Sequence, residues 1–579
     1  MDNSTLPTLQ PPTASILTTL VSDGPSYLTA HPVLLLLTLI LLLLATTRYL
    51  SSRSTFSGRS KNGSPSPIPA VSYTFPLLGH LPAMAYDAAA FTRNLRDIYR
   101  SSGAYSLNFG GTVHNIIFAP ALATSMLNQP TANAEAETVF KSLMGRVFGW
   151  PIVAESEGYD AFLAPLNALY VNFSSKEPLD AMVGRTAERV KAMIGEFVTG
   201  NESQVDQTLW ERFANAEVKR DAKGEEVVEV NLLELVRDWC ARAANASIIG
   251  SDFINNFPEF WKDLYEMDRG FLLLATGLPR WLPIPPLTRA HLARKRMLDS
   301  LELFERAVDK HGDGEDAGAE WRELDDVGPV VKGRLELYRK YGISMRARAA
   351  TELALMWAAN ANSNSLVFWM LERVYADKAL LALLRREIDP YVRPAQSTSD
   401  FGMPELPRLE VLDVEGICSS CPLLKSCYIE CLRVDTASWS LKIVKEDFVL
   451  APRDKEAQTW ILRKGEFAHV AHDLHNTDPN VFEHPDVWKP DRHVKYDEDG
   501  KAVGADFGSM RPYGGGGHMC KGRQFAYKEC MMFVAAIIAM WDIDPVGGGE
   551  WKMPKHKKAT GVYNTSSPTR VWMKRRTSP

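Results

Sequence analysis

A run of four glycines, residues 514–517, lies three residues before a cysteine and an apolar segment with helical periodicity. Consecutive glycines favour neither helix nor strand, and they give the backbone the freedom that a tight loop needs. Such a loop would present Cys520 just before a helix over 524–541, beside Lys521 and Arg523. A helix N-terminus and neighbouring cations both favour an ionised thiol. The sequence therefore predicts a loop that presents a thiolate.

A glycine-rich loop can also cradle phosphate. Phosphate loops follow a strand and end in Lys-Ser or Lys-Thr, and neither feature is present here. The formal net charge of -5 gives no reason to expect a nucleic-acid partner. We therefore favour the thiolate interpretation.

The other cysteines do not indicate a disulfide framework, because seven in 579 residues are too few. This usage fits a body that faces the reducing cytosol. Four of them superficially resemble a zinc site: Cys418, Cys421, Cys427 and Cys431. Closed zinc sites usually have two short pairs separated by a longer loop. We expect the last three to lie along one helix as small buried residues, with zinc as the alternative.

An apolar stretch near the N-terminus predicts a membrane anchor. Residues 24–47 carry no charge, and 33–45 are almost all Leu and Ile, which is just enough for a helix to cross a bilayer. A cleaved signal peptide is the alternative, but its basic leading region is missing. No Lys or Arg precedes the stretch and four follow it, Arg48, Arg53, Arg59 and Lys61. This asymmetry places the short tail in the lumen and the rest in the cytosol.

We therefore expect four parts: a lumenal tail over 1–27, a transmembrane anchor over 28–50, a Pro-rich hinge over 51–80, and a body over 81–579. Helical patterns dominate the body, above all over 89–100, 230–244, 290–310, 345–375 and 379–388. Two polar segments, 217–226 and 312–326, are expected to be solvated surface loops. The apolar loop 277–287, with Trp281 inside it and basic residues after it, either dips into a membrane surface or forms a buried connection.

The cysteine loop resembles the haem loop of the cytochrome P450 superfamily. The family pattern, aromatic-x-x-Gly-x-basic-x-Cys-x-Gly, is present as Tyr513, Gly516, His518, Cys520 and Gly522. The resemblance implies haem b, with the Cys520 thiolate as axial iron ligand and His518 as a donor to a haem propionate. It also implies a mainly α fold with a small β lobe near 104–119 and 438–470.

Two further segments support the resemblance. Glu430 and Arg433 match the family's Glu-x-x-Arg on a helix, where a spacing of three places both side chains on one face. Arg492 closes a segment, 488–492, that looks like the family's aromatic-x-Pro-acid-Arg. By resemblance, Glu430, Arg433 and Arg492 form a buried structural ion triad. No clean Trp-x-x-x-Arg occurs in the early helices, so one customary propionate contact has no candidate.

The long helix over 345–375 departs from the usual family pattern. Most members have an acid followed by an alcohol there, and this chain has Asn362 followed by Ser363. Small and polar residues at these positions predict a kink that a ligand could approach. The arrangement resembles the branch that contains sterol 7α-hydroxylase, oxysterol hydroxylases and prostacyclin synthase. In that branch, a basic residue near a propionate corresponds to Lys442.

The resemblance implies a monooxygenase of the endoplasmic reticulum membrane that hydroxylates a hydrophobic molecule such as a steroid, terpenoid or polyketide. Electrons would come from NADPH–cytochrome P450 reductase through a basic face formed by Arg511, Lys521, Arg523 and Lys528. Because the helix acid is replaced, an alternative function is a peroxide isomerase or dehydratase. Such an enzyme needs neither reductase nor O₂. A haem-binding protein without turnover is the third possibility.

Overall fold

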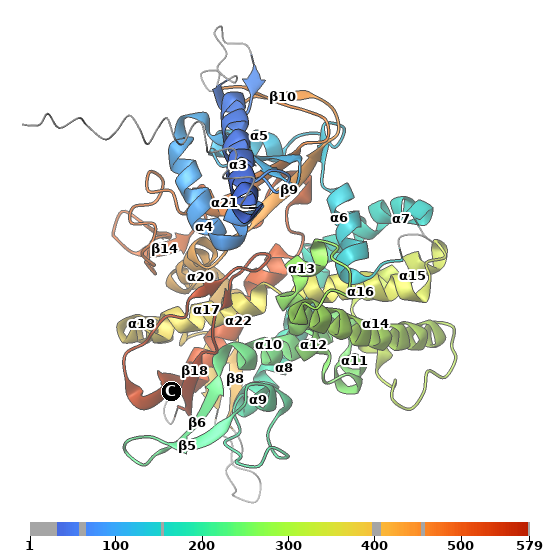
Figure 1. Ribbon diagram of the computed structural model, residues 1–579. Coiled ribbons are helices and arrows are strands. Elements are labelled where there is room, and N and C mark those ends of the chain that lie inside the picture. The colour runs from blue at the N-terminus through green and yellow to red at the C-terminus, as the bar shows by residue number, and fades with distance from the viewer. Residues whose placement is uncertain (1–31, 57–64, 152–155, 396–406, 453–457, 577–579) are drawn as a thin grey trace, which may run out of the picture. The chain divides into compact units, whose positions relative to one another are not determined.

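The computed structural model describes residues 32–56, 65–151, 156–395, 407–452 and 458–576. It divides into two compact units, residues 1–125 with 444–469 and residues 126–443 with 470–579. Within the described ranges, the chain is mainly helical with small sheets (Figure 1). The predicted fold class is therefore confirmed. The predicted tail, 1–27, lies outside the described residues.

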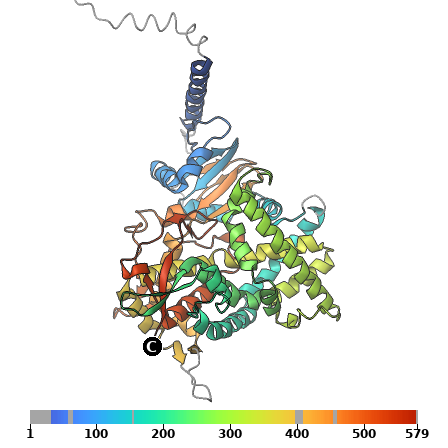
Figure 2. The same cartoon turned by 60° about the horizontal axis from the view of Figure 1, so that its bottom comes forward.

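The first unit begins with one long apolar helix, α3 (Pro32–Phe56). Its segment Pro32–Arg53 has 22 residues with a mean hydropathy of 2.3, long and apolar enough to cross a membrane. None of this segment is buried inside the protein, and Figure 2 draws α3 as one continuous helix. The helix runs six residues past the predicted end of the anchor at residue 50, because the Ser-rich residues that follow continue it.

The rest of the first unit contains short strands and one amphipathic helix, α4 (Leu81–Ile98). Strands β2 (Ala104–Phe109) and β3 (Thr112–Ile117) form an antiparallel hairpin. A second sheet pairs β1 (Ser66–Pro67) with β11 (Trp460–Leu462), which also pairs with β10 (Phe448–Leu450). Part of the expected Pro-rich hinge is therefore a strand of a sheet. Proline is tolerated in such short edge strands.

The second unit is built around α22 (Arg523–Met540), whose residues from Glu529 to Met540 are all buried. A helix that is apolar on every side must be surrounded by other elements. Contacts to α22 come from α8 (Lys176–Met193) and α17 (Ser363–Tyr375), and α17 also contacts α10 (Leu232–Ile249) and α20 (Pro422–Val434). Figure 1 shows α17 and α22 in the middle of this group. This core carries the candidate site.

The predicted long helix over 345–375 consists of two helices. The first, α16 (Met345–Asn360), ends just before Ala361 and Asn362, and α17 begins at Ser363. The predicted kink is therefore present at the predicted residues.

One polar segment is not a loop. Strands β5 (Glu217–Arg220) and β6 (Glu226–Asn231) form a hairpin that extends a sheet with β18 (Arg570–Arg575) and β15 (Trp541–Pro545). The prediction of a solvated loop over 217–226 was wrong, because charged residues on an exposed edge strand still pair through their backbone. The other polar segment, 312–326, begins at the last residue of α14 (Pro285–Gly312) and then has no helix or strand apart from the one turn Leu324–Asp326.

The cysteine-rich segment forms two helices, α19 (Val414–Ser420) and α20, with Cys421 between them. Cys421, Cys427 and Cys431 are buried, and burial raises the pKa of each thiol. No cluster of potential metal ligands occurs in the described part of the chain. The burial of these side chains agrees with the interpretation as small buried residues, although only two of the three lie within one helix.

Candidate active site

The cysteine loop has a backbone that requires glycine. Gly516 has φ +63°, and a Cβ on it would lie 2.3 Å from the carbonyl oxygen of Leu127. A side chain at this position would therefore be strained and would also clash. Gly517 has open space around it. The loop is closed by the Cys520 N–H, which donates to the Tyr513 carbonyl at 3.0 Å.

Cys520 is exposed and lies three residues before the start of α22. Desolvation raises the pKa of its thiol, while N–H groups of Gly522 and Arg523 and the charges of Arg523 and Lys521 act in the opposite direction. The predicted stabilising groups are thus present, but they do not outweigh desolvation. A coordinated metal ion deprotonates a thiol outright, so iron would have to complete the ionisation.

The two predicted propionate donors have different surroundings. His518 is exposed, with Nε2 3.6 Å from Oε1 of Glu137. Lys442 is buried and donates to the carbonyl oxygens of Leu127, at 3.1 Å, and Gln129, at 3.3 Å. Burial lowers the pKa of Lys442. Among the described residues, no carboxylate lies within ion-pair distance of this ammonium.

Glu430 is the centre of a buried ion cluster. Arg433 donates to both of its oxygens, at 2.7 and 2.8 Å, and Arg492 donates from 3.0 Å. His493 adds a contact at 3.0 Å that the sequence analysis did not include. Desolvation would raise the pKa of Glu430, but the hydrogen bonds from Arg433 and His493 outweigh it and hold the pKa at about 2. The predicted triad residues are therefore together, with a fourth member.

The helix break is filled from another part of the chain. The amide oxygen of Asn362 accepts a hydrogen bond from the Val562 N–H at 2.9 Å. Gly561 lies so close that a Cβ there would be 2.3 Å from the same oxygen. Asn362 is therefore a docking point for the C-terminal segment, rather than an open face for a ligand as predicted.

The other asparagines of this region form a satisfied network. Asn360 exchanges hydrogen bonds with Asn245 of α10, at 2.7 and 3.0 Å. Asn364 donates to Asn360, at 3.0 Å, and to the hydroxyl of Tyr265, at 2.9 Å. Buried amides with these partners carry little desolvation cost.

Glu529 is a residue of this region that was not predicted from the sequence. It lies on α22, is buried, and shares a hydrogen bond with the Ser363 side chain of α17. Burial raises the pKa of Glu529 to about 8, so its carboxyl is protonated at neutral pH. The Ser363 hydroxyl donates to the Ala359 carbonyl at 3.1 Å, and its hydrogen bond with the Glu529 carboxyl lowers the pKa of that carboxyl, against the larger effect of burial. A lone acid in an apolar helical stretch was the available signal.

The basic residues expected on one face differ in their surroundings. Lys521 is exposed, and Arg511 and Arg523 are partly exposed. Lys528 is different, because it pairs with Glu415 at 2.9 Å and Asp180 at 3.3 Å. Its charge is therefore largely compensated.

Taken together, the fold and this site define a haem-thiolate protein. The fit rests on the exposed sulfur of Cys520, on a loop with no room for a side chain at Gly516, and on the buried Lys442, which has no counter-ion among the described residues. A buried cation without an anion is costly, and a haem propionate would supply one.

A family model described as Cytochrome P450 matches residues 336–573. Cytochrome P450 monooxygenase efuG of Hormonema carpetanum is 25% identical over 86% of this chain and 87% of its own length. Cytochrome P450 monooxygenase calL of Penicillium decumbens is 26% identical over 57% of this chain and 58% of its own length. Rat 25-hydroxycholesterol 7-alpha-hydroxylase is 30% identical over 38% of this chain and 51% of its own length.

Residues 336–573 are therefore similar to the cytochrome P450 family of haem-thiolate monooxygenases, and a relative named as such a monooxygenase aligns over most of the chain. Its cofactor is haem, with iron held by an axial cysteine thiolate. Two of the relatives are named 25-hydroxycholesterol 7-alpha-hydroxylase and cholesterol 7-alpha-monooxygenase, in agreement with the predicted branch, and the chain spans about half the length of each.

Proposed function

We propose that this protein is a membrane-anchored monooxygenase that hydroxylates a hydrophobic small molecule with O₂ and electrons from an NADPH-dependent reductase. The observation that carries the proposal is the pair Ser363–Glu529. A hydroxyl bonded to a buried carboxyl that is protonated at neutral pH holds a transferable proton. Monooxygenation consumes protons, whereas rearrangement of a peroxide does not. The pair therefore favours the monooxygenase.

In this proposal the residues around the haem have separate roles. Cys520 is the iron ligand, and the bound haem supplies activation of O₂ and oxidation of a C–H bond. His518 and Lys442 bind the propionates, while Tyr513, Gly516 and Gly522 shape the loop. Glu529 donates to Ser363, and Asn362 holds the C-terminal segment beside them.

The Glu430 cluster is proposed to be structural. All three of Glu430, Arg433 and His493 are buried, and Arg492 is nearly so. Removing one member of a buried ion cluster leaves an unpaired interior charge, which costs roughly 3–5 kcal/mol. Its proposed role is to hold α20 against the segment that leads to the cysteine loop.

The substrate class follows from the membrane segment and the relatives. The helix Pro32–Arg53 is apolar enough for an anchor, and Trp281 in the predicted apolar loop is 79% exposed. This exposure supports contact with lipid rather than a buried connection. Several relatives are named as sterol hydroxylases. We therefore propose a lipid-soluble substrate, such as a steroid, terpenoid or polyketide, and an endoplasmic reticulum membrane with the catalytic unit in the cytosol.

Arg511, Lys521 and Arg523 are the proposed contacts for an acidic reductase surface. Lys528 contributes less than the sequence suggested, since Glu415 and Asp180 neutralise it. Rim charges of this kind mainly change the association rate and its salt dependence.

A peroxide isomerase remains the second candidate, because Asn362 stands where most of the family has an acid. The deciding experiment uses the full-length holoprotein with a pool of lipid-soluble substrates. We expect oxygenated products only with NADPH, reductase and O₂, and incorporation of ¹⁸O from labelled O₂. Product formed from a lipid peroxide without reductase would establish the isomerase instead. Intact haem without any product would indicate a non-catalytic protein.

A further inference from the structure

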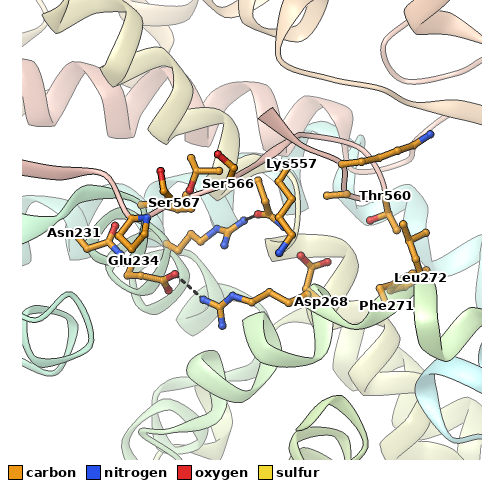
Figure 3. A pocket seen from close by; sticks show the side chains of 17 residues that line it. Asn231, Glu234, Asp268, Phe271, Leu272, Lys557, Thr560, Ser566 and Ser567 are labelled. Atoms are coloured by element: carbon orange, nitrogen blue, oxygen red, sulfur yellow. Dashed lines mark hydrogen bonds and ion pairs between the residues drawn. The ribbon is translucent and has the colours of Figure 1, made fainter. Parts of the chain in front are cut away.

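A polar cavity of about 220 Å³ lies in the second unit, between the start of α10, the end of α12 (Phe260–Arg269), α13 (Phe271–Ala275) and residues 557–568 (Figure 3). None of the residues assigned above to the haem or to proton transfer lines it. Six charged residues do, of which four are cationic: Arg237, Arg269, Lys557, Lys558, Glu234 and Asp268.

Arg237 is the unusual member, because it is only 2% exposed and has neutral partners. Its guanidinium donates to the Ser365 hydroxyl at 2.8 and 3.1 Å and to the side-chain oxygen of Asn564. It also lies over the ring of Tyr265, 4.9 Å from the centroid. Within the described ranges, no carboxylate is within ion-pair distance of it. A buried charge without a counter-ion is costly, and an anionic ligand would remove that cost.

The remaining charges also leave an excess of cations. Arg269 is neutralised by Glu234 at 2.6 Å and by Glu266 at 2.9 Å. Asp268 accepts a hydrogen bond from the Trp357 indole at 2.9 Å. Lys557 and Lys558 are exposed, and neither has an ion pair in the part of the chain that the structure describes. Thr560, Ser566 and Ser567, labelled in Figure 3, add hydroxyl donors to the lining.

The cavity is connected to the helix break through two shared segments. Ser365, the partner of Arg237, lies two residues after Ser363 on α17. Asn564, the other partner, lies two residues after Val562, whose N–H is bound by Asn362. A molecule held in the cavity would therefore lie against the same two segments that form the proposed proton-transfer site.

We propose that this cavity binds the anionic oxygen group of an amphipathic substrate, a carboxylate carried on a hydrophobic skeleton. The inference rests on the proposed monooxygenase function and narrows its substrate class. Arg237 provides a buried positive charge, and Nη1 is the guanidinium nitrogen that makes no hydrogen bond to the described residues, because Nε and Nη2 donate to Ser365 and Asn564. Lys557 provides a second charge at the rim, and the hydroxyls complete the donor set.

The test compares three probes with one skeleton: cholanic acid, its methyl ester and the corresponding primary alcohol. Their dissociation constants are measured on the full-length holoprotein in detergent, by calorimetry and by displacement of the Soret band. We expect the acid to bind roughly tenfold or more tightly than the ester and the alcohol. Equal affinity for all three would overturn the proposal.

Two variants test whether the cavity residues cause the tighter binding of the acid. Lys557→Ala and Arg237→Gln are each expected to reduce the preference for the acid to about threefold or less. Lys555→Ala, an exposed lysine on the same segment outside the cavity, is expected to leave it unchanged. Acid preference that survives in both Lys557→Ala and Arg237→Gln would show that the carboxylate binds elsewhere. If Arg237→Gln does not retain haem, Lys557→Ala with Lys558→Ala decides in its place.

A further titration distinguishes a substrate carboxylate from a free inorganic anion as the ligand of the cavity. Sodium sulfate alone is added to the protein. Sulfate binding that is lost in the Lys557→Ala variant, without any preference for cholanic acid, would identify an inorganic anion site and refute the substrate assignment. The reduced carbon monoxide spectrum and NADPH-driven turnover of the neutral ester are recorded in parallel. Turnover without acid preference rejects only this inference, whereas absence of turnover with every probe rejects the proposed function.

Discussion

The cysteine loop and the helix break are two parts of one proposed site, and they are built in opposite ways. The loop is exposed, and glycine backbone conformations such as that of Gly516 define it. The break is buried, and side chains from distant segments define it: Glu529 contacts Ser363, and Val562 contacts Asn362. A backbone-defined site leaves a contiguous motif in the sequence. A site defined by side-chain contacts does not.

The largest expected effect is that of Cys520→Ala. Loss of the only exposed cysteine among the described residues removes the proposed axial ligand. The red-shifted Soret band of the reduced carbon monoxide complex and NADPH-driven product should both fall to background. Cys418→Ala, at a partly exposed cysteine outside the loop, is the control and should behave as the parent. A Cys520→Ala protein that keeps the shifted band would disprove the ligand assignment.

Gly516→Ala tests the backbone side of the comparison. The positive φ alone costs roughly 1–3 kcal/mol in a residue with a side chain, and the clash with Leu127 adds to it. We expect a marked loss of haem retention and of the free energy of unfolding. Gly517→Ala is the matched control, because nothing lies within 4 Å of its added Cβ. Equal haem retention and equal free energies of unfolding in the two variants would show that the loop does not require glycine at residue 516.

Glu529→Gln tests the buried helix break of this comparison. The amide keeps the shape and the hydrogen bond to Ser363 but is a poor acid, so the product formed per NADPH should fall by about tenfold or more. In the parent protein this yield should decline as pH rises through about 8, where Glu529 ionises. The variant should show no such decline. An unchanged yield in Glu529→Gln would remove Glu529 from the proton path.

The same carboxyl should also affect stability. Its pKa is raised from 4.5 to about 8 in the folded protein, so folding is most favoured where both states are protonated, below about pH 4.5. The parent should lose stability relative to Glu529→Gln as pH rises from about 4.5 to about 8, and the difference should then remain constant. Denaturant titrations at several pH values measure it. A parent protein that gains stability relative to Glu529→Gln as pH rises would contradict the assigned burial.

Asn362→Asp is expected to have the smallest effect. Its carboxylate still accepts the Val562 N–H, so the free energy of unfolding should change by less than about 1.5 kcal/mol. In a Glu529→Gln background, however, it places an acid back beside Ser363. Partial recovery of product per NADPH in the double variant would show that the two acids serve one function. If the product formed per NADPH does not recover, the role of Asn362 is only to hold the C-terminal segment.

Much of the fold was predictable, for identifiable reasons. The apolar helix α3 and the kink at Asn362 follow from composition and local pattern, which short-range physics controls. The hairpin β5–β6 could not be predicted in this way, because its partner strand β18 lies more than three hundred residues away along the chain. His493 likewise joined the Glu430 cluster only through contacts between segments far apart in sequence.

By itself, the sequence determined the glycine loop, its cysteine and the two motifs of the ion cluster, because their geometry is set by neighbours along the chain. Only the tertiary structure decided that Ser363 has a protonated acid beside it and that Arg237 is buried without a carboxylate. Burial and pairing depend on which distant segments pack together. The pKa of Glu529 and the unmet charge of Arg237 are set by that packing.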